Sequence, residues 1–143
     1  MKKIGLISLV ILITVSACKT SQTSKSGDAE KKFVSTFLTY MDHEKGPLRD
    51  EMMACISPTY IKDNGINTKT MKVNNYSIWG FNIDYYVAAD GMVVTKVWGE
   101  EKKWIHQLEF KVVKEKGQLY LMPSRHSDAY IDPWFAAKTY VKE

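Results

Sequence analysis

Three side chains in two alternating stretches of the sequence have the chemistry of acid–base catalysis. His106 alternates with Trp104 and Leu108, so it is expected on the apolar face of a strand. A neutral imidazole in such a setting can accept a proton. Asp84 and Tyr86 lie in a neighbouring alternating stretch and would supply a carboxylate and a phenol. Together they are weak candidates for an acid–base site.

A core histidine that is satisfied by one hydrogen bond explains the position of His106 equally well, and we favour that interpretation. The sequence also lacks the motifs GxSxG, HExxH, GxGxxG and GxxxxGK[ST], which mark common classes of enzyme. Catalysis is therefore the minority hypothesis, and no cofactor is expected.

A polar segment nearer the C-terminal end offers a guanidinium, an imidazole and carboxylates. These come from Arg125, His126, Ser127, Asp128 and Asp132. Arg125 could grip an anionic ligand. One histidine with scattered oxygens is a poor donor set for a metal, so we predict no metal site. A solvated turn with local hydrogen bonds is the favoured interpretation.

Aromatic residues surround Pro133, and they could dock on the core or form a partner site, because Trp and Tyr often anchor interfaces. Docking is favoured, because large apolar residues near a terminus usually pack when they are ordered. The residues predicted to bind a ligand or a partner, from this segment and from the sheet, are Trp104, His106, Arg125, Tyr130 and Trp134.

The beginning of the chain has the order of an export signal. Two lysines precede fourteen uncharged residues, 4–17, a stretch shorter than the about 20 apolar residues that span a bilayer. The stretch ends in Val-Ser-Ala-Cys at residues 15–18. This order resembles the bacterial lipobox, in which an aliphatic residue and two small residues precede the cysteine that receives lipid.

The resemblance implies that residues 1–17 are a lipoprotein signal peptide and that Cys18 is lipidated. Residues 18–27 then form a flexible tether to a single domain, 28–143, and the membrane is a partner through the lipid anchor. Lys19 is not the acidic residue that resembles an inner-membrane retention signal. We therefore expect the bacterial cell envelope, at the outer membrane facing the periplasm. A secretory signal with a chance cysteine is the alternative.

Charge and cysteine content add two exclusions. The chain has 20 Lys and Arg against 16 Asp and Glu, a formal charge of +4, with no dense basic cluster, so nucleic acid is not an expected partner. With Cys18 lipidated, Cys55 is the remaining thiol and no intrachain disulfide can form. Cys55 lies in an apolar helical run, which predicts a buried thiol.

Helical periodicity begins near residue 28. Apolar residues recur every third or fourth position, among them Phe37 and Met41, which predicts an amphipathic helix. Two shorter helices are predicted to begin near Pro47 and Pro58, since proline suits the first helical turn.

Alternation of apolar and polar residues then predicts four strands. They are expected at 76–87, 92–98, 104–113 and 118–123. Asp90–Gly91 and Lys116–Gly117 are the predicted turns of two hairpins. Pro133 is expected to open a short helix in the tail.

Helices followed by four closely connected strands predict an α+β domain, in which N-terminal helices pack on a curved antiparallel meander. The order of elements over about residues 28–126 resembles the cystatin-like and NTF2-like superfold. The tail from residue 128 departs from that plan, in which the sheet comes last. A different four-stranded α+β sandwich therefore remains open.

Three functional hypotheses follow. The first is a non-enzymatic, membrane-anchored domain that binds or scaffolds a small apolar ligand or an envelope protein, which could also be a second copy of the chain. The second is an NTF2-like acid–base enzyme, of the isomerase or dehydratase type. The third is an envelope inhibitor or assembly factor that acts through a surface loop near Trp134.

Overall fold

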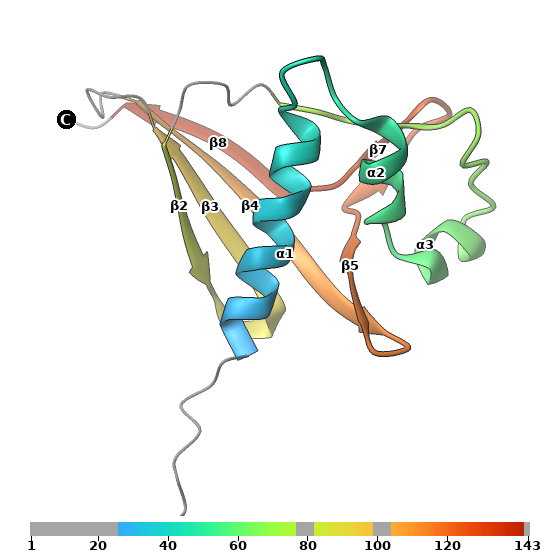
Figure 1. The fold of residues 1–143 in the computed structure, drawn as a ribbon, viewed down its shortest axis with the longest axis horizontal. Helices are drawn as coiled ribbons and strands as arrows, with labels where there is room; N and C mark the ends of the chain where they lie inside the picture. The colour runs from blue at the N-terminus through green and yellow to red at the C-terminus, as the bar shows by residue number, and fades with distance from the viewer. Residues whose placement is uncertain (1–25, 77–81, 99–103, 142–143) are drawn as a thin grey trace, which may run out of the picture.

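The computed structural model describes residues 26–76, 82–98 and 104–141. The predicted signal peptide, Cys18 and nearly all of the tether lie outside these residues. Figure 1 shows a long first helix that crosses an antiparallel sheet. Two short helices and a second sheet lie beyond one end of this antiparallel sheet.

The first helix, α1 (Ser26–Met41), confirms the predicted helix. Asp28 in its first turn is favourable there, because the amino end of a helix carries partial positive charge. Its buried residues recur three and four positions apart and therefore share one face: Val34, Phe37, Leu38 and Met41.

The two predicted short helices are α2 (Arg49–Ala54) and α3 (Pro58–Asp63). Gly46 adopts a φ of +98° between α1 and α2, a conformation that glycine takes without steric cost. Ser57 caps α3, because its hydroxyl accepts a hydrogen bond of 3.1 Å from the backbone N–H of Tyr60.

The four predicted strands form one antiparallel meander, which we call the main sheet; residues 77–81 of the first, predicted at 76–87, lie outside the described residues. In spatial order they are β2 (Asn82–Val87), β3 (Met92–Trp98), β4 (Trp104–Glu115) and β5 (Gln118–Met122). Both predicted turns have left-handed residues where the chain reverses, at Asp90–Gly91, within the 3-10 turn η1 (Ala89–Gly91), and at Lys116–Gly117. The predicted α+β class is confirmed.

The predicted short helix after Pro133 is wrong. Residues 136–141 instead form strand β8 (Ala136–Val141), which pairs antiparallel with residues 104–109 of β4. The reason lies in β4, which pairs with β3 along one edge. Along its other edge, β5 pairs with residues 111–115 only. Without β8 the first half of this long strand would leave backbone groups of β4 unpaired. The main sheet therefore has five strands.

A second, three-stranded sheet was not predicted, and we call it the small sheet. It has the order β1 (Lys72–Val73), β7 (Tyr130–Asp132) and β6 (Arg125–His126), with β1 and β7 parallel. Its strands are two or three residues long, too short to leave an alternating pattern in the sequence.

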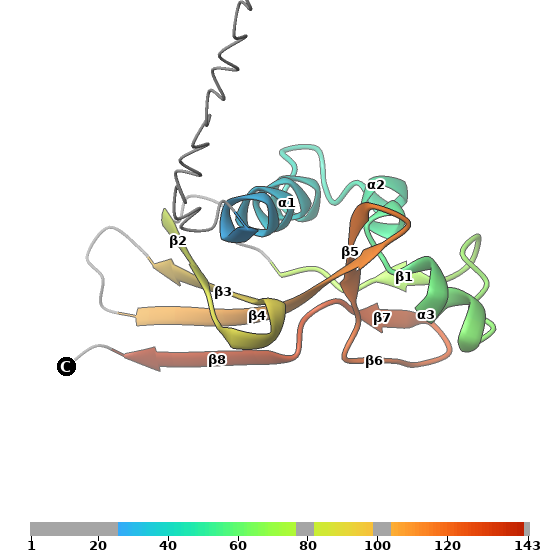
Figure 2. The same cartoon turned by 90° about the horizontal axis from the view of Figure 1, so that it is seen from below.

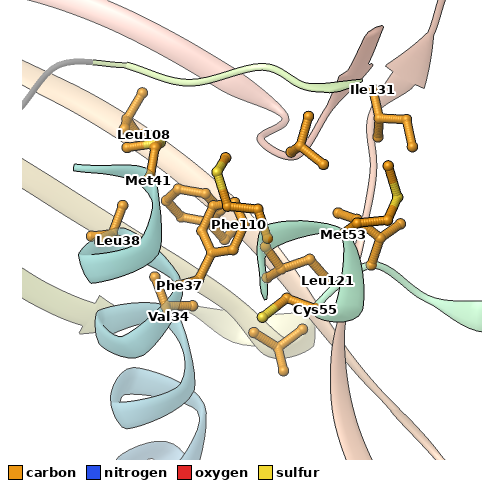
Figure 3. Close-up of a cluster of buried hydrophobic side chains, with 14 of the residues drawn as sticks. Val34, Phe37, Leu38, Met41, Met53, Cys55, Leu108, Phe110, Leu121 and Ile131 are labelled. Carbon is orange, nitrogen blue, oxygen red and sulfur yellow. The ribbon is translucent and has the colours of Figure 1, made fainter. Parts of the chain in front are cut away.

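α1 lies on one face of the main sheet, which we call the inner face, α2 and α3 lie beside the small sheet, and none of the described helices covers the outer face of the main sheet (Figure 2). Figure 3 shows the apolar core between α1 and the inner face, where Phe37 and Phe110 pack edge to face with ring centroids 5.8 Å apart. The same cluster continues past Met53 to Ile131 of the small sheet. No helix among the described residues is both long enough and apolar enough to cross a membrane.

Candidate functional site

His106 lies on the inner face of the main sheet, as predicted. It stands in register with Val97 of β3, which pairs with Ile83 of β2. Its Nδ1 shares a hydrogen bond of 2.7 Å with the hydroxyl of Tyr76, and the two rings pack edge to face. The imidazole is half-buried, so it has the partner expected of a core histidine.

Asp84 and Tyr86 lie on the opposite face from His106. Successive side chains of a strand point to opposite faces, and Asp84 follows the inner-face residue Ile83. Asp84 accepts a hydrogen bond of 3.0 Å from the indole N–H of Trp98, and Tyr86 is 49% exposed. The structure therefore does not bring the three acid–base candidates together.

The space between α1 and the sheet is filled by side chains. Phe37, Leu38 and Met41 from the helix meet Leu108 and Phe110 from β4, and all five are at most 1% exposed. Close packing of this kind leaves no room for a small apolar ligand between these residues. The backbone of Trp104 belongs to β4, but its side chain lies outside the described residues.

The small sheet brings the polar candidates together. Arg125 and Asp132 are directly opposite each other on β6 and β7, and Arg125 Nε donates to Asp132 Oδ2 at 2.6 Å. The other carboxylate oxygen, Oδ1, accepts from the side-chain amide of Asn74, next to β1. The Arg125 side chain is 81% exposed, whereas that of Asp132 is 15% exposed. A buried carboxylate thus holds an exposed guanidinium.

Electrostatics keep this arginine charged. The hydrogen bond from Arg125 to Asp132, and the attraction between their charges, raise the pKa of the guanidinium above its ordinary value. Among the described residues its terminal nitrogens have no hydrogen-bond partner, so they remain available to a ligand.

Two hollows border this ion pair. The first, of about 340 Å³, is lined by the ion pair and by Asn74, His126, Ser127 and Tyr130. The second, of about 400 Å³, is lined by the ion pair and by Ser124, Trp134 and Phe135. Both linings combine hydrogen-bonding groups with aromatic rings, Tyr130 in the first and Trp134 and Phe135 in the second.

The first hollow is braced by α3. The hydroxyl of Tyr60 shares a hydrogen bond of 2.9 Å with His126 Nδ1, and the two rings pack edge to face. Burial, followed by the negative charge of Asp132, raises the pKa of the Tyr60 phenol. Tyr60 therefore stays protonated and fixes the ring of His126 beside the exposed arginine.

The aromatic segment divides between the core and the surface. Trp134 is half-buried against the core and meets Tyr76 edge to face, with ring centroids 6.4 Å apart. Tyr130 and Phe135 remain 43% and 45% exposed. Phe135 is held in place by its backbone N–H, which donates to the Glu109 carbonyl at 2.7 Å. The segment therefore both docks and presents aromatic surface.

Neither metal nor thiol chemistry gains support from these residues. Among the described residues, no group of three or more His, Cys, Asp and Glu side chains is arranged to hold a metal ion. Cys55 is buried, as predicted, and burial raises the pKa of its thiol to about 11. At neutral pH it is an unreactive thiol.

The structure brings together Arg125 and Tyr130, which were predicted, with Asn74 and Tyr60, which were not. Asn74 reaches the site only because β1 pairs with β7, and Tyr60 only because α3 lies beside β6. Neither contact joins neighbours in sequence, so no local pattern signals it. Phe135 belongs to the aromatic segment around Pro133, but its exposure was not predicted.

Comparison of the chain with protein-family models, with curated proteins and with solved structures finds no match. The basis for a functional inference is therefore the arrangement of the side chains themselves. The described surface around Arg125 combines a charge fixed by an ion pair with two exposed aromatic rings, those of Tyr130 and Phe135.

Proposed function

We propose that this chain is a cell-envelope lipoprotein, anchored through Cys18, whose domain binds a protein partner and does not catalyse a reaction. The observation that supports the binding role is the exposed guanidinium of Arg125, which is held by Asp132 and lines one hollow with Tyr130 and another with Phe135, whose rings are both exposed. Arginine and tyrosine are among the residues that contribute most to protein interfaces.

A protein partner is favoured over a small apolar ligand. The interior beneath α1 is occupied by the side chains of the core, while the hollows beside Arg125 are open at the surface. A partner that covered both hollows would remove Tyr130 and Phe135 from water and pair the guanidinium. A surface of this kind would serve both the first hypothesis, a domain that binds an envelope protein, and the third, an envelope factor that acts through its surface.

The acid–base enzyme is disfavoured by geometry. Catalytic groups must reach one ligand position, and His106 and Asp84 lie on opposite faces of the same sheet. Each also has a hydrogen-bond partner that accounts for its position, Tyr76 for His106 and Trp98 for Asp84.

For the finer fold class we propose the cystatin-like and NTF2-like group. The support is the packing of α1 on an antiparallel meander that runs in the order β2, β3, β4, β5. The addition of β8 beside β4, and of the small sheet, would be elaborations of that plan.

The proposed binding surface lies far from Ser26, where the predicted tether meets the described domain. α1 begins at the end of β2, where Gly27 packs against Val87, and its 16 residues span about 24 Å. Beyond its other end, α2 packs against β1 of the small sheet (Figure 1). We propose that the domain lies on the periplasmic side of the outer membrane, where a tether that joins it at Ser26 leaves the Arg125 surface accessible to a partner.

The anchor is tested by metabolic labelling with a fatty-acid analogue. We expect label on the wild-type chain and on Cys55→Ala, which is the matched cysteine control, and no label on Cys18→Ala. Cys18→Ala should also leave the membrane fraction. Label that persists in Cys18→Ala would contradict the lipoprotein assignment.

The binding surface is tested by placing a photo-crosslinking amino acid at Tyr130, at Phe135 or at Tyr86 in cells that produce the chain. Tyr86 is the control, because it is about as exposed but lies on the outer face of the main sheet. We expect one discrete adduct from Tyr130 and Phe135 and none from Tyr86. An adduct of twice the chain's mass would identify the partner as a second copy. Adducts from Tyr86 alone would move the binding surface to the main sheet.

A further inference from the structure

We infer that the Arg125 surface recognises an acidic segment of its protein partner, in which a carboxylate is followed by an apolar side chain. This inference deepens the proposed function and rests on it for the existence of a partner. Its basis is the geometry around Arg125: one occupied guanidinium nitrogen, a counter-ion whose two oxygens each already accept a hydrogen bond, and an exposed aromatic ring in each of the two neighbouring hollows.

The guanidinium is oriented to accept a carboxylate end-on. Nε is already used by Asp132, and the two terminal nitrogens form a pair of parallel donors that matches the two oxygens of a carboxylate. Asp132 does not occupy the terminal nitrogens of Arg125. Its second oxygen accepts from the side-chain amide of Asn74, and the Asp132 side chain is only 15% exposed.

The site is rigid before a ligand arrives. Arg125 and Asp132 are cross-strand partners in paired strands, and Asn74 ties the carboxylate to the neighbouring parallel strand. A long arginine side chain normally loses conformational entropy when it binds a ligand. In this protein the ion pair with Asp132 already restricts Arg125 in the folded state, so less entropy is lost on binding. Such preorganisation favours recognition of one specific group.

The charge around the arginine favours a singly charged group. Asp128, in the turn between β6 and β7, and Lys72 of β1, whose backbone N–H donates to the carbonyl of Ala129 in that turn, are both exposed and opposite in charge. Arg125 itself already shares its charge with Asp132. A carboxylate needs one cationic fork, whereas a phosphate dianion is better matched by several cationic groups.

The exposed ring of Phe135 indicates what stands beside the carboxylate. Ser124, Trp134 and Phe135 line one of the two hollows next to Arg125. Phe135 is 45% exposed, and an apolar side chain placed there would remove it from water. The other hollow contains Asn74 and Ser127, whose side chains already bond Asp132 and Tyr130.

The test uses the full chain purified from cells in detergent, and isothermal titration with three probes. The probes are acetyl-Asp-Phe-amide, acetyl-Asn-Phe-amide and inorganic phosphate. We expect the Asp peptide to bind with a Kd on the order of 1 mM, and the Asn peptide and phosphate to bind at least about tenfold more weakly. Equal binding of the two peptides would overturn recognition of a carboxylate, and equal binding of phosphate would overturn the apolar neighbour.

Three variants identify the group responsible. Arg125→Gln should lower affinity for the Asp peptide about tenfold, and Arg125→Lys should lower it less, because the charge remains but the fork is lost. Lys114→Gln removes an exposed positive charge on β4 and should change nothing. If Arg125→Gln does not fold, Arg125→Lys and Phe135→Ala carry the test. Unchanged affinity in these variants would overturn the site.

The inference and the proposed function fail in different ways. Crosslinks from Tyr130 without binding of the Asp peptide would support the partner-binding surface and overturn the inference that this surface recognises a carboxylate. Binding of the Asp peptide without crosslinks from Tyr130 or Phe135 would leave a carboxylate site with no protein partner.

Discussion

Glu115 shows how a single carboxylate joins two parts of this fold. It lies at the end of β4, and one oxygen accepts a hydrogen bond from the Ser57 hydroxyl. The other oxygen accepts from the backbone N–H of Thr59 at 3.2 Å and from its hydroxyl at 2.8 Å. The bond from Ser57 is the largest of the effects that lower the pKa of Glu115. The first turn of α3 is thereby fixed to the end of a strand.

We predict that Glu115→Gln lowers the free energy of unfolding by about 1 kcal/mol at pH 7, since the amide can replace only part of this network. The lowered pKa means that the carboxylate stabilises the folded state above its ordinary value near 4.5, and that this contribution is lost as the pH falls through the folded pKa. The difference between wild type and variant should therefore shrink below about pH 4.5. Urea unfolding between pH 7 and pH 3 measures it.

The matched control for this prediction is Glu44→Gln, an exposed glutamate in the turn after α1. Its unfolding free energy should stay close to that of the wild type across the same pH range. A difference between wild type and Glu115→Gln that does not depend on pH would argue that the carboxylate charge is irrelevant.

The face of a strand on which a side chain lies was predictable from its own segment, whereas the binding role of a residue stays a prediction. His106 was placed on the inner face, and Arg125, Tyr130 and Trp134 were named as binding candidates, three residues that line the two hollows. The pairing of His106 with Asp84 had less support, because Asp84 occupies a polar position between inner-face neighbours. The parity of its own strand already placed it on the other face.

At the scale of elements, β4 organises the main sheet. One edge pairs with β3, and the other edge is divided between β8 and β5. The turns at Asp90–Gly91 and Lys116–Gly117 were predictable, because only a few residue types tolerate left-handed backbone. β8 was not predicted, although Thr139, Tyr140 and Val141 favour strands. The prediction of a short helix relied on Pro133, which suits a first helical turn, and not on the strand-forming residues that follow it.

Removal of residues 136–143 should expose the edge of β4 at residues 104–109. An unpaired strand edge invites pairing with another molecule, so we expect self-association and a lower midpoint of thermal unfolding. Size-exclusion chromatography and circular dichroism measure both effects. Removal of residues 142–143 alone is the control and should leave the protein monodisperse. A truncated chain that stays as stable as the control would mean that β8 adds nothing to the sheet.

The small sheet marks the limit of what the sequence could predict. Its strands are two or three residues long, and β1 pairs with β7 across more than fifty residues of chain. Local patterns cannot signal pairing at that separation, and the site depends on it through Asn74. The class of the fold was therefore accessible, while the geometry of its binding surface was not.

At the scale of the whole molecule, one apolar cluster joins both sheets and all three helices. It runs from Phe37 and Phe110 beneath α1 to Met52, Val73 and Ile131 beside the small sheet. Because these side chains share contacts, neither sheet has a core of its own. We expect the described domain to unfold as one cooperative unit.

Phe37→Ala should therefore destabilise the entire molecule, by about 3–5 kcal/mol, since it removes a fully buried ring that packs against Phe110. Tryptophan fluorescence and far-UV circular dichroism should report the same midpoint in urea. Phe135→Ala is the control, and its 45% exposed ring predicts a change within about 0.5 kcal/mol. If Phe37→Ala does not fold, Phe37→Leu should show the same order of effect. Two separate transitions would contradict a shared core.

The pairing of β8 with β4 also sets the order in which the molecule can be completed. Residues 104–109 emerge from the ribosome before their partners at 136–141, so this half of β4 waits for the last described strand. Pairing between distant parts of a chain slows folding. The segment between β4 and β8 must lose conformational entropy before contacts between these two strands offset that loss. The main sheet is therefore complete only after residue 141 has been synthesised, so β8 is the last of its strands that can pair.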